Sequence, residues 1–128
     1  MNEIVLDASA ILAIIQREPG HEALTPDLLA HATASAVNVA EVHGKLISRG
    51  WSSQEAWEDA ISPLHRIVSF DSTYARIVGD LVSLTKQLGL SLGDRACLAL
   101  GIALKVPVYT AEKAWKKLRL GAEIQVIR

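Results

Sequence analysis

The chain has 128 residues, half of them hydrophobic, and a formal net charge of −1. A chain of this length is expected to be a single domain (residues 1–128) that buries roughly two thirds of its unfolded surface, which is enough for a core without covalent staples. The near-zero net charge argues against a dedicated nucleic-acid coat protein and leaves room for a local basic patch.

The cysteine content and the hydropathy pattern narrow the class further. The single cysteine, Cys97, excludes an intramolecular disulfide and a zinc site built on cysteines. No basic region precedes the first apolar run, so we expect no secretory signal, and every uncharged stretch is shorter than the roughly 18 residues of a membrane helix. We therefore expect a cytoplasmic protein that does not enter a membrane.

Short runs rich in β-branched and other apolar residues predict the strands. They lie at residues 3–7, 33–37, 67–70, 107–110 and 123–127. Segments of helical composition separate them, with apolar residues at helical spacing. Helices are expected over 8–16, over 21–30, from 38 to a stop at 49–50, from 51 to a limit at Pro63, from 71 to 89, over 91–105 and over 112–118.

Candidate caps support these helix starts. They are Ser9 for the first helix, Ser52 or Ser53 for the fourth and Asp71 for the fifth, while Pro26 marks either a kink or a helix start. Strands alternate with helices along the chain, which predicts an α/β fold with three α/β/α layers and a central parallel sheet of about five strands.

Four acidic residues stand where helices begin, next to strands of this predicted sheet. Asp7 ends the first strand, Glu41 follows the second, Asp94 opens the apolar helix before the fourth, and Glu112 follows the fourth. Ligands of open parallel sheets collect outside the carboxyl ends of the strands, so the topology can bring all four acids to one edge.

Each acid also has a purely local explanation. Asn38 and Glu41 have the spacing of a capping box, as do Ser91 and Asp94, and Thr110 is placed to cap the helix that carries Glu112. A carboxylate in a first helical turn also suits the helix dipole, by about 0.3–1 kcal/mol.

Repulsion distinguishes a cluster from four separate caps. Two carboxylates about 5 Å apart repel by roughly 3 kcal/mol at an effective dielectric near 20, so six such pairs exceed the whole stability of about 5–15 kcal/mol of a domain. A tight cluster therefore persists only when protonated or bound to a cation. Oxygen ligands without cysteine favour Mg²⁺ or Mn²⁺, which suit phosphate chemistry.

The blocks IVLDASAIL, SAVNVAEV and LSLGDRACLALGIAL and the turn Thr110-Ala111-Glu112 together resemble a PIN domain, specifically the VapC-like toxins of bacterial toxin–antitoxin pairs. The resemblance spans essentially the whole chain. It implies a metal-dependent endoribonuclease in which Asp7, Glu41 and Asp94 bind Mg²⁺ or Mn²⁺ and Glu112 takes the fourth acidic place. Ser9 and Thr110 match supporting hydroxyl positions.

The resemblance also implies a mechanism and partners. Asp7 and Asp94 would anchor the first ion, Glu41 would be a further ligand or orient the attacking water, and the products would carry a 5′-phosphate and a 3′-hydroxyl. The expected partners are an RNA substrate, a cognate antitoxin and a second copy of the chain in a homodimer. One departure is that the fourth acidic place is usually Asp, whereas Glu112 is one methylene longer.

Basic residues beside the acids are candidates for RNA contact, although such a run is also typical of a solvated helix face. They are Arg95, Lys113 and Lys116. Trp115 is expected to anchor the core, and no histidine is needed for the chemistry.

Two other functions compete with the nuclease. One is a catalytically inactive PIN-like adaptor or RNA-binding module. The other is a different Mg²⁺-dependent α/β protein, such as a receiver domain or a haloacid-dehalogenase-like phosphatase. The sequence Asp7-Ala8-Ser9 disfavours the latter class, because it lacks the paired acids of a receiver and the second Asp of a phosphatase.

Overall fold

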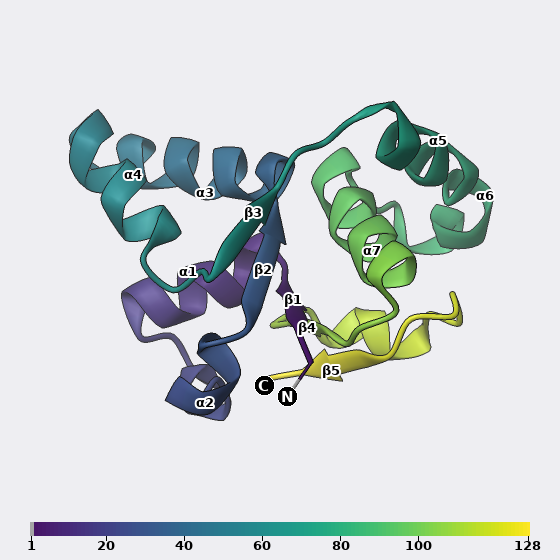
Figure 1. Cartoon of the computed structure of the whole chain (residues 1–128), viewed down its shortest axis with the longest axis horizontal. Helices are drawn as coiled ribbons and strands as arrows, with labels where there is room; N and C mark the ends of the chain where they lie inside the picture. The colour runs from purple at the N-terminus through teal and green to yellow at the C-terminus, as the bar shows by residue number, and fades with distance from the viewer. Residues whose placement is uncertain (1) are drawn as a thin grey trace.

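Five strands form one fully parallel sheet in the computed structural model, which describes residues 2–128 (Figure 1). The spatial order is β3-β2-β1-β4-β5. The strands are β1 (Ile4–Leu6), β2 (Ala32–Ser35), β3 (Arg66–Val68), β4 (Val108–Thr110) and β5 (Ile124–Val126). All five predicted strands are thus confirmed, with ends that differ by one or two residues from the expected ones.

Helices fill the connections between the strands. The α-helices are α1 (Ala8–Gln16), α2 (Pro26–Leu29), α3 (Ala36–Ser48), α4 (Ser53–Ile61), α5 (Ser72–Asp80), α6 (Val82–Thr85) and α7 (Leu92–Leu104). Three 3₁₀ turns accompany them: η1 (His21–Ala23), η2 (Lys86–Leu88) and η3 (Lys113–Lys117). None of the helices in the described range is long and apolar enough to span a bilayer.

The strand order explains the three layers. The chain steps outward from β1 to β2 to β3, then returns past β1 to β4 and β5. Crossovers between parallel strands are right-handed, so a reversal of direction moves the following helices to the opposite face. Figure 1 shows this arrangement, with α1, α3 and α4 on one side of the sheet and α5, α6 and α7 on the other.

Each face of the sheet therefore has its own core. On one face, Ile11 of α1 and Val42 and Leu46 of α3 belong to the core between these helices and the sheet. Leu98 and Trp115 pack with the opposite face, together with the buried thiol of Cys97. The predicted role of Trp115 as a core anchor is confirmed, since it is 2% exposed.

Two of the predicted helices are divided. The segment expected as one helix over 21–30 is η1 followed by α2, because Pro26 occupies the first turn of α2 and Thr25 caps it, so Pro26 marks a helix start. The segment from 71 to 89 begins at the predicted cap Asp71 but continues as α5, α6 and η2 before it ends at Gly89.

One predicted helix start was wrong, and the predicted cap of α4 is confirmed. Helix α3 begins at Ala36 rather than near Asn38, because the Ser35 hydroxyl accepts a hydrogen bond from the Val37 N–H and ends β2 there. Of the two serines proposed for α4, Ser52 is the cap.

Candidate active site

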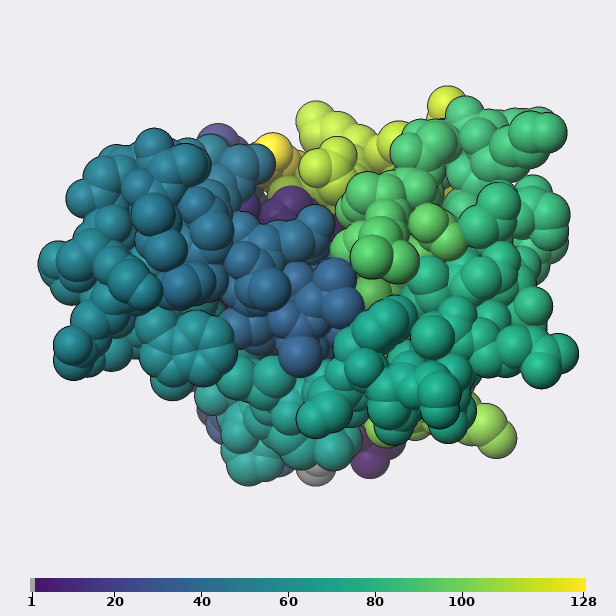
Figure 2. All heavy atoms as spheres, turned by 90° about the horizontal axis from the view of Figure 1, so that it is seen from above, coloured from purple at the N-terminus to yellow at the C-terminus, as the bar shows by residue number. Residues whose placement is uncertain are grey.

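The four predicted acids meet at the carboxyl edge of the sheet, around one open cavity of about 170 Å³. Asp7, Ala8, Ser9, Leu12, Glu41, Lys45, Asp94 and Glu112 line it. Figure 2 looks onto this edge: atoms of the N-terminal segment lie at the floor of a hollow between α3, α7 and the segment of η3. Four acids from four separate segments therefore share one site.

The reversal of strand order determines where this site forms. Strands β1 and β4 are neighbours, with Leu6 paired to Tyr109, and the chain departs from them in opposite directions. Such a switch point leaves a crevice beyond the carboxyl ends of the two strands, since the following helices go to different faces. Asp7 and Thr110 lie at this crevice, one residue after Leu6 and Tyr109 respectively.

Asp7 is buried and held by several hydrogen bonds. Its carboxylate accepts from the Ala10 N–H at 2.8 Å, the Thr110 hydroxyl at 2.6 Å and the Ser9 hydroxyl at 2.8 and 2.9 Å. Asp7 is thus the cap of α1, and the prediction that Ser9 caps this helix was wrong. Ser9 and Thr110 instead fix the orientation of the Asp7 carboxylate.

The same two hydroxyls tie α1 to the segment after β4. Ser9 Oγ accepts from the Ala111 N–H at 2.9 Å, and Thr110 Oγ1 accepts from the Glu112 N–H at 3.0 Å. Because each hydroxyl donates to Asp7 while it accepts a backbone N–H, the two strand ends and the acid form one connected network. The backbone of Glu112 is therefore positioned relative to Asp7.

Burial dominates the electrostatics of Asp7. Its side chain is nearly inaccessible (3% exposed), and desolvation raises its pKa from 3.8 to about 6. The hydrogen bonds from Thr110, Ala10 and Ser9 oppose that shift, whereas the charge on Asp94 adds to it. The part of the chain from residue 2 to 128 supplies Asp7 with no ion-pair partner.

Glu41 lies in the second turn of α3, facing α7. The capping-box interpretation of Asn38 and Glu41 was wrong, because Ser35 is the cap. The Asn38 amide nevertheless donates to Glu41 Oε1 at 3.0 Å, and also to the Gly93 carbonyl at 3.0 Å. Asn38 thus contacts the carboxylate of the site from inside the protein, a role that the sequence did not predict.

Asp94 serves as a cap and also lines the cavity. It forms the predicted capping box with Ser91: the Ser91 N–H donates to Asp94 Oδ2 at 3.0 Å, and the Asp94 N–H donates to Ser91 Oγ at 3.1 Å. Glu112 is exposed at the rim, immediately before η3. Local capping therefore accounts for part of the placement of Asp94, as it does for Asp7, which caps α1.

The site is an open cavity and not a closed cage. Within residues 2–128, no three His, Cys, Asp or Glu side chains are arranged as a ready-made metal cage. Asp94 is half-buried and Glu41 and Glu112 are exposed, so water screens much of the repulsion that four close carboxylates would produce. The donor set still fits a hard divalent cation, because carboxylate oxygens line the cavity without thiol or imidazole.

The structure shows one positively charged residue at the site that was not predicted from the sequence. Lys45 lines the cavity together with Glu41, one helical turn away on α3. The i,i+4 spacing of the two residues was a visible signal. Among the described residues, no carboxylate lies within 4.0 Å of Lys45 Nζ.

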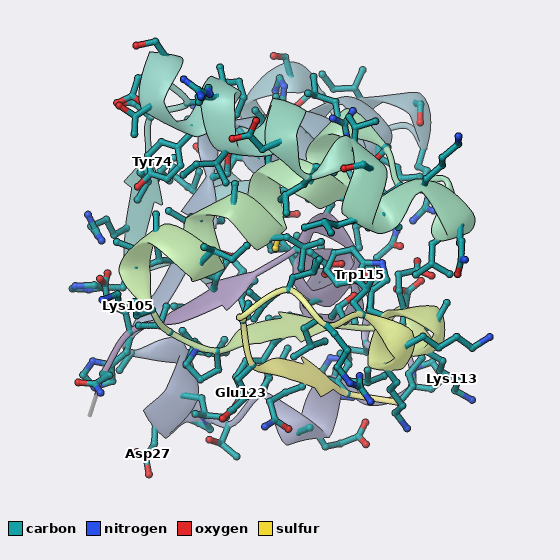
Figure 3. All side chains as sticks on the ribbon, turned by 90° about the vertical axis from the view of Figure 1, so that its right-hand side faces the viewer. Asp27, Tyr74, Lys105, Lys113, Trp115 and Glu123 are labelled. Atoms are coloured by element: carbon teal, nitrogen blue, oxygen red, sulfur yellow. The ribbon has the colours of Figure 1, made fainter. Side chains whose placement is uncertain are left out.

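The three predicted RNA contacts do not line this cavity. The Arg95 guanidinium donates to the Val78 carbonyl at 3.0 Å and borders a different cavity, near α6. Lys113 and Lys116 are exposed on η3, where Figure 3 shows Lys113 at the periphery and Trp115 directed into the protein. Lys113 follows Glu112 directly and Lys116 lies four residues after it, so both are close in sequence to this acid of the site.

Comparisons with known proteins agree with this architecture. The PIN domain family matches residues 4–120. A chain of the DNA-bound VapBC complex from Salmonella typhimurium superposes with a TM-score of 0.77 at 15% identity, covering 100% of both chains. A search of curated proteins found no match.

Two further solved structures share the fold. The VapBC2 complex from Rickettsia felis, bound to a promoter DNA fragment, gives a TM-score of 0.74 at 18% identity over 96% of this chain and 97% of that one. VapC20 from Mycobacterium tuberculosis, a toxin that cleaves the sarcin-ricin loop, gives 0.72 at 14% identity over 91% and 97%. The sequence match over nearly the whole chain excludes the receiver and phosphatase alternatives, and the chain belongs to the PIN domain family.

Proposed function

We propose that this protein is a Mg²⁺- or Mn²⁺-dependent endoribonuclease toxin that a cognate antitoxin neutralises. One observation carries the proposal: Asp7 is 3% exposed, has no cationic partner among residues 2–128, and shares its cavity with Glu41, Asp94 and Glu112. A buried carboxylate without a counter-charge costs stability unless something else, such as a cation, compensates it. Membership of a family of nucleases supports the same conclusion.

The metal ligands are proposed to be Asp7, Asp94 and Glu41. When bound, a divalent ion would lower the pKa of a water molecule and stabilise the charge that develops on a phosphodiester under in-line attack. Asp7 is pre-oriented for such a ligand, because Ser9 and Thr110 lock its carboxylate. Asp94 has one carboxylate oxygen in its capping bond to Ser91, which leaves the other oxygen for the cavity.

Glu112 is proposed to act from the rim. It is exposed, and its side chain is one methylene longer than the aspartate usual at this place in the family. Its backbone N–H donates a hydrogen bond to Thr110, so the backbone is fixed while the side chain can move. A water-mediated contact with the ion or with the attacking water suits this geometry better than direct ligation does.

RNA would reach the acids past positive charges. Lys45 in the cavity wall is placed to neutralise a phosphate next to the carboxylates, and Lys113 and Lys116 extend the positive charge along η3. Arg95 stays a predicted contact, with one N–H already bound to the Val78 carbonyl. Phosphate contacts of this kind supply affinity without reading the base sequence.

The proposed protein partners rest on the structural relatives. The Salmonella typhimurium and Rickettsia felis structures are VapBC complexes, and another relative is a toxin–antitoxin complex from Klebsiella pneumoniae. By analogy, we propose an antitoxin partner and a homodimer for this chain. The alignment with the Salmonella typhimurium chain covers 100% of both chains, which supports this analogy.

An RNA cleavage assay with three proteins tests the proposed activity. Wild type is expected to cleave a structured RNA in Mn²⁺ and to stop in EDTA. Asp7→Asn is expected to lose at least about 100-fold in rate, as removal of a group that stabilises transition-state charge does. Asp71→Asn, the same change at the exposed cap of α5, is expected to leave the rate unchanged.

Three other results of this assay would contradict the proposal. Cleavage that persists in EDTA, or in Asp7→Asn protein at the wild-type rate, would refute the site assignment. RNA binding without cleavage under all conditions would favour the inactive adaptor instead.

A further inference from the structure

We infer that Asn38 and Gly93 are positioning residues that hold the Glu41 carboxylate at the metal cavity by joining α3 to the first turn of α7. The inference rests on the proposed function, since it concerns how one of the proposed ligands is placed. Neither residue lines the cavity, so neither is proposed to touch metal or RNA.

Asn38 is a buried polar side chain that connects the two helices. It is 1% exposed, and its Nδ2 donates both to Glu41 Oε1, on its own helix, and to the Gly93 carbonyl, 55 residues away on α7. One amide group thus bonds the ligand and the neighbouring helix at the same time. A change in the separation of α3 and α7 would break one of the two bonds.

The amide oxygen of Asn38 shows that this arrangement reduces stability. Asn38 Oδ1 is buried and has no hydrogen-bond partner among the described residues. An unsatisfied buried acceptor is unfavourable, and an apolar residue of similar size would avoid it. A residue retained only to pack the core would have no need of this amide, so the two donated bonds are the reason that we assign to it.

Gly93 provides the space for the Glu41 carboxylate. A Cβ atom placed on Gly93 would overlap the carboxylate of Glu41. Gly93 is helical, with no positive φ, so the backbone does not require glycine there. The close approach of Glu41 to α7 is the feature that excludes a side chain.

The two contacts act in the same direction. Asn38 draws Glu41 towards α7, and Gly93 lets it come close. Asp94 follows Gly93 directly, so this arrangement also fixes the placement of Glu41 relative to Asp94. Residues that orient a ligand in this way commonly change metal affinity by about 10- to 100-fold when they are removed.

Two glycines of α7 offer a matched test. Gly93→Ala and Gly101→Ala make the same change in the same helix, and both added methyl groups overlap a neighbour. The neighbour is the Glu41 carboxylate at Gly93 but a methyl group of the fully buried Val108 at Gly101. Mn²⁺ dissociation constants from calorimetry and metal-free Tm values are measured for both variants.

The inference predicts opposite patterns. Gly93→Ala is expected to weaken Mn²⁺ binding at least about 10-fold while it changes the metal-free Tm little, because the Glu41 side chain is exposed and swings away. Gly101→Ala is expected to lower the Tm and leave the Mn²⁺ affinity of the folded protein unchanged. Equal Mn²⁺ affinity of Gly93→Ala and wild type would overturn the inference.

Asn38→Leu gives an independent measurement. It keeps approximate volume, removes both donated bonds and removes the unsatisfied Oδ1. We expect weaker Mn²⁺ binding with a metal-free Tm at or above that of wild type, whereas unchanged affinity would overturn the inference. A wild-type protein that binds no Mn²⁺ overturns the proposed function and the inference together; wild-type binding with unaffected variants overturns the inference alone.

Discussion

Substitution of Asp7 by Asn is expected to stabilise the metal-free protein, and more so at high pH than at low pH. Asp7 has a folded pKa of about 6 against an ordinary value of 3.8. Well below pH 3.8 the carboxyl is protonated in both states and has no effect. As the pH rises towards 6, the unfolded state ionises first, so stability falls, and above 6 the full penalty is present.

The size of this effect follows from the shift. A difference of 6 minus 3.8 corresponds to about 3 kcal/mol at neutral pH and above. At about 2.1 cal/mol/K per residue, 128 residues give an unfolding entropy near 0.27 kcal/mol/K, so 1 kcal/mol is worth about 4 °C in Tm. The upper limit is therefore a rise in Tm of about 11 °C. The actual rise is smaller, because a neutral amide forms a weaker hydrogen bond with Thr110 than the carboxylate does.

Thermal unfolding in EDTA at pH 4.5 and at pH 8 measures this prediction. About two thirds of the 3 kcal/mol develops between these pH values, so the Tm of Asp7→Asn minus that of wild type should be about 7 °C larger at pH 8. Asp71→Asn, at an exposed cap, should shift Tm by less than about 2 °C, as surface changes do. A Tm difference for Asp7→Asn that is the same at both pH values would refute the reasoning.

Three further predictions concern the cavity. Mn²⁺ at about 100 times its Kd stabilises the folded protein by about 2.7 kcal/mol and should raise the wild-type Tm by about 10 °C. Asp94→Asn should lose most of this rise. Equal rises in both proteins would show that Asp94 is not a ligand. Lys45→Met should weaken RNA binding and reduce the slope of log K against log salt by about 0.7, measured by anisotropy across a KCl series; an unchanged slope would exclude a phosphate contact. Glu112→Gln should slow single-turnover RNA cleavage less than Asp7→Asn does, because Glu112 is exposed at the rim; losses of equal size would mean that Glu112 is a direct ligand.

The sheet and the convergence of the acids were predictable because they follow from chain order. Apolar runs that alternate with helices require parallel pairing, and parallel pairing puts Asp7 and the residues after β4 at one edge. The capping box of Ser91 and Asp94 was predictable for a similar reason, since it depends on residues three positions apart. Local spacing and topology therefore determine which acids meet.

Contacts between helices could not be predicted from the sequence. Ser35 rather than Asn38 caps α3, and Asn38 is free to bond the Gly93 carbonyl only because α3 and α7 pack together. The overlap that excludes a side chain at Gly93 depends on the same packing. Lys45 differs from these, because its spacing from Glu41 was visible and only its orientation towards the cavity was not.

The energetics of Asp7 connect stability to function. A penalty of about 3 kcal/mol is a large part of the 5–15 kcal/mol that keeps a domain folded, so a sequence selected for stability alone would not keep a carboxylate there. An asparagine would cap α1 without the charge. A cation bound only to the folded state returns a similar amount, about 2.7 kcal/mol at 100 times its Kd. We therefore propose that a cation occupies this site when the protein is active, and that the Asp7 carboxylate, whose charge destabilises the metal-free fold, is one of its ligands.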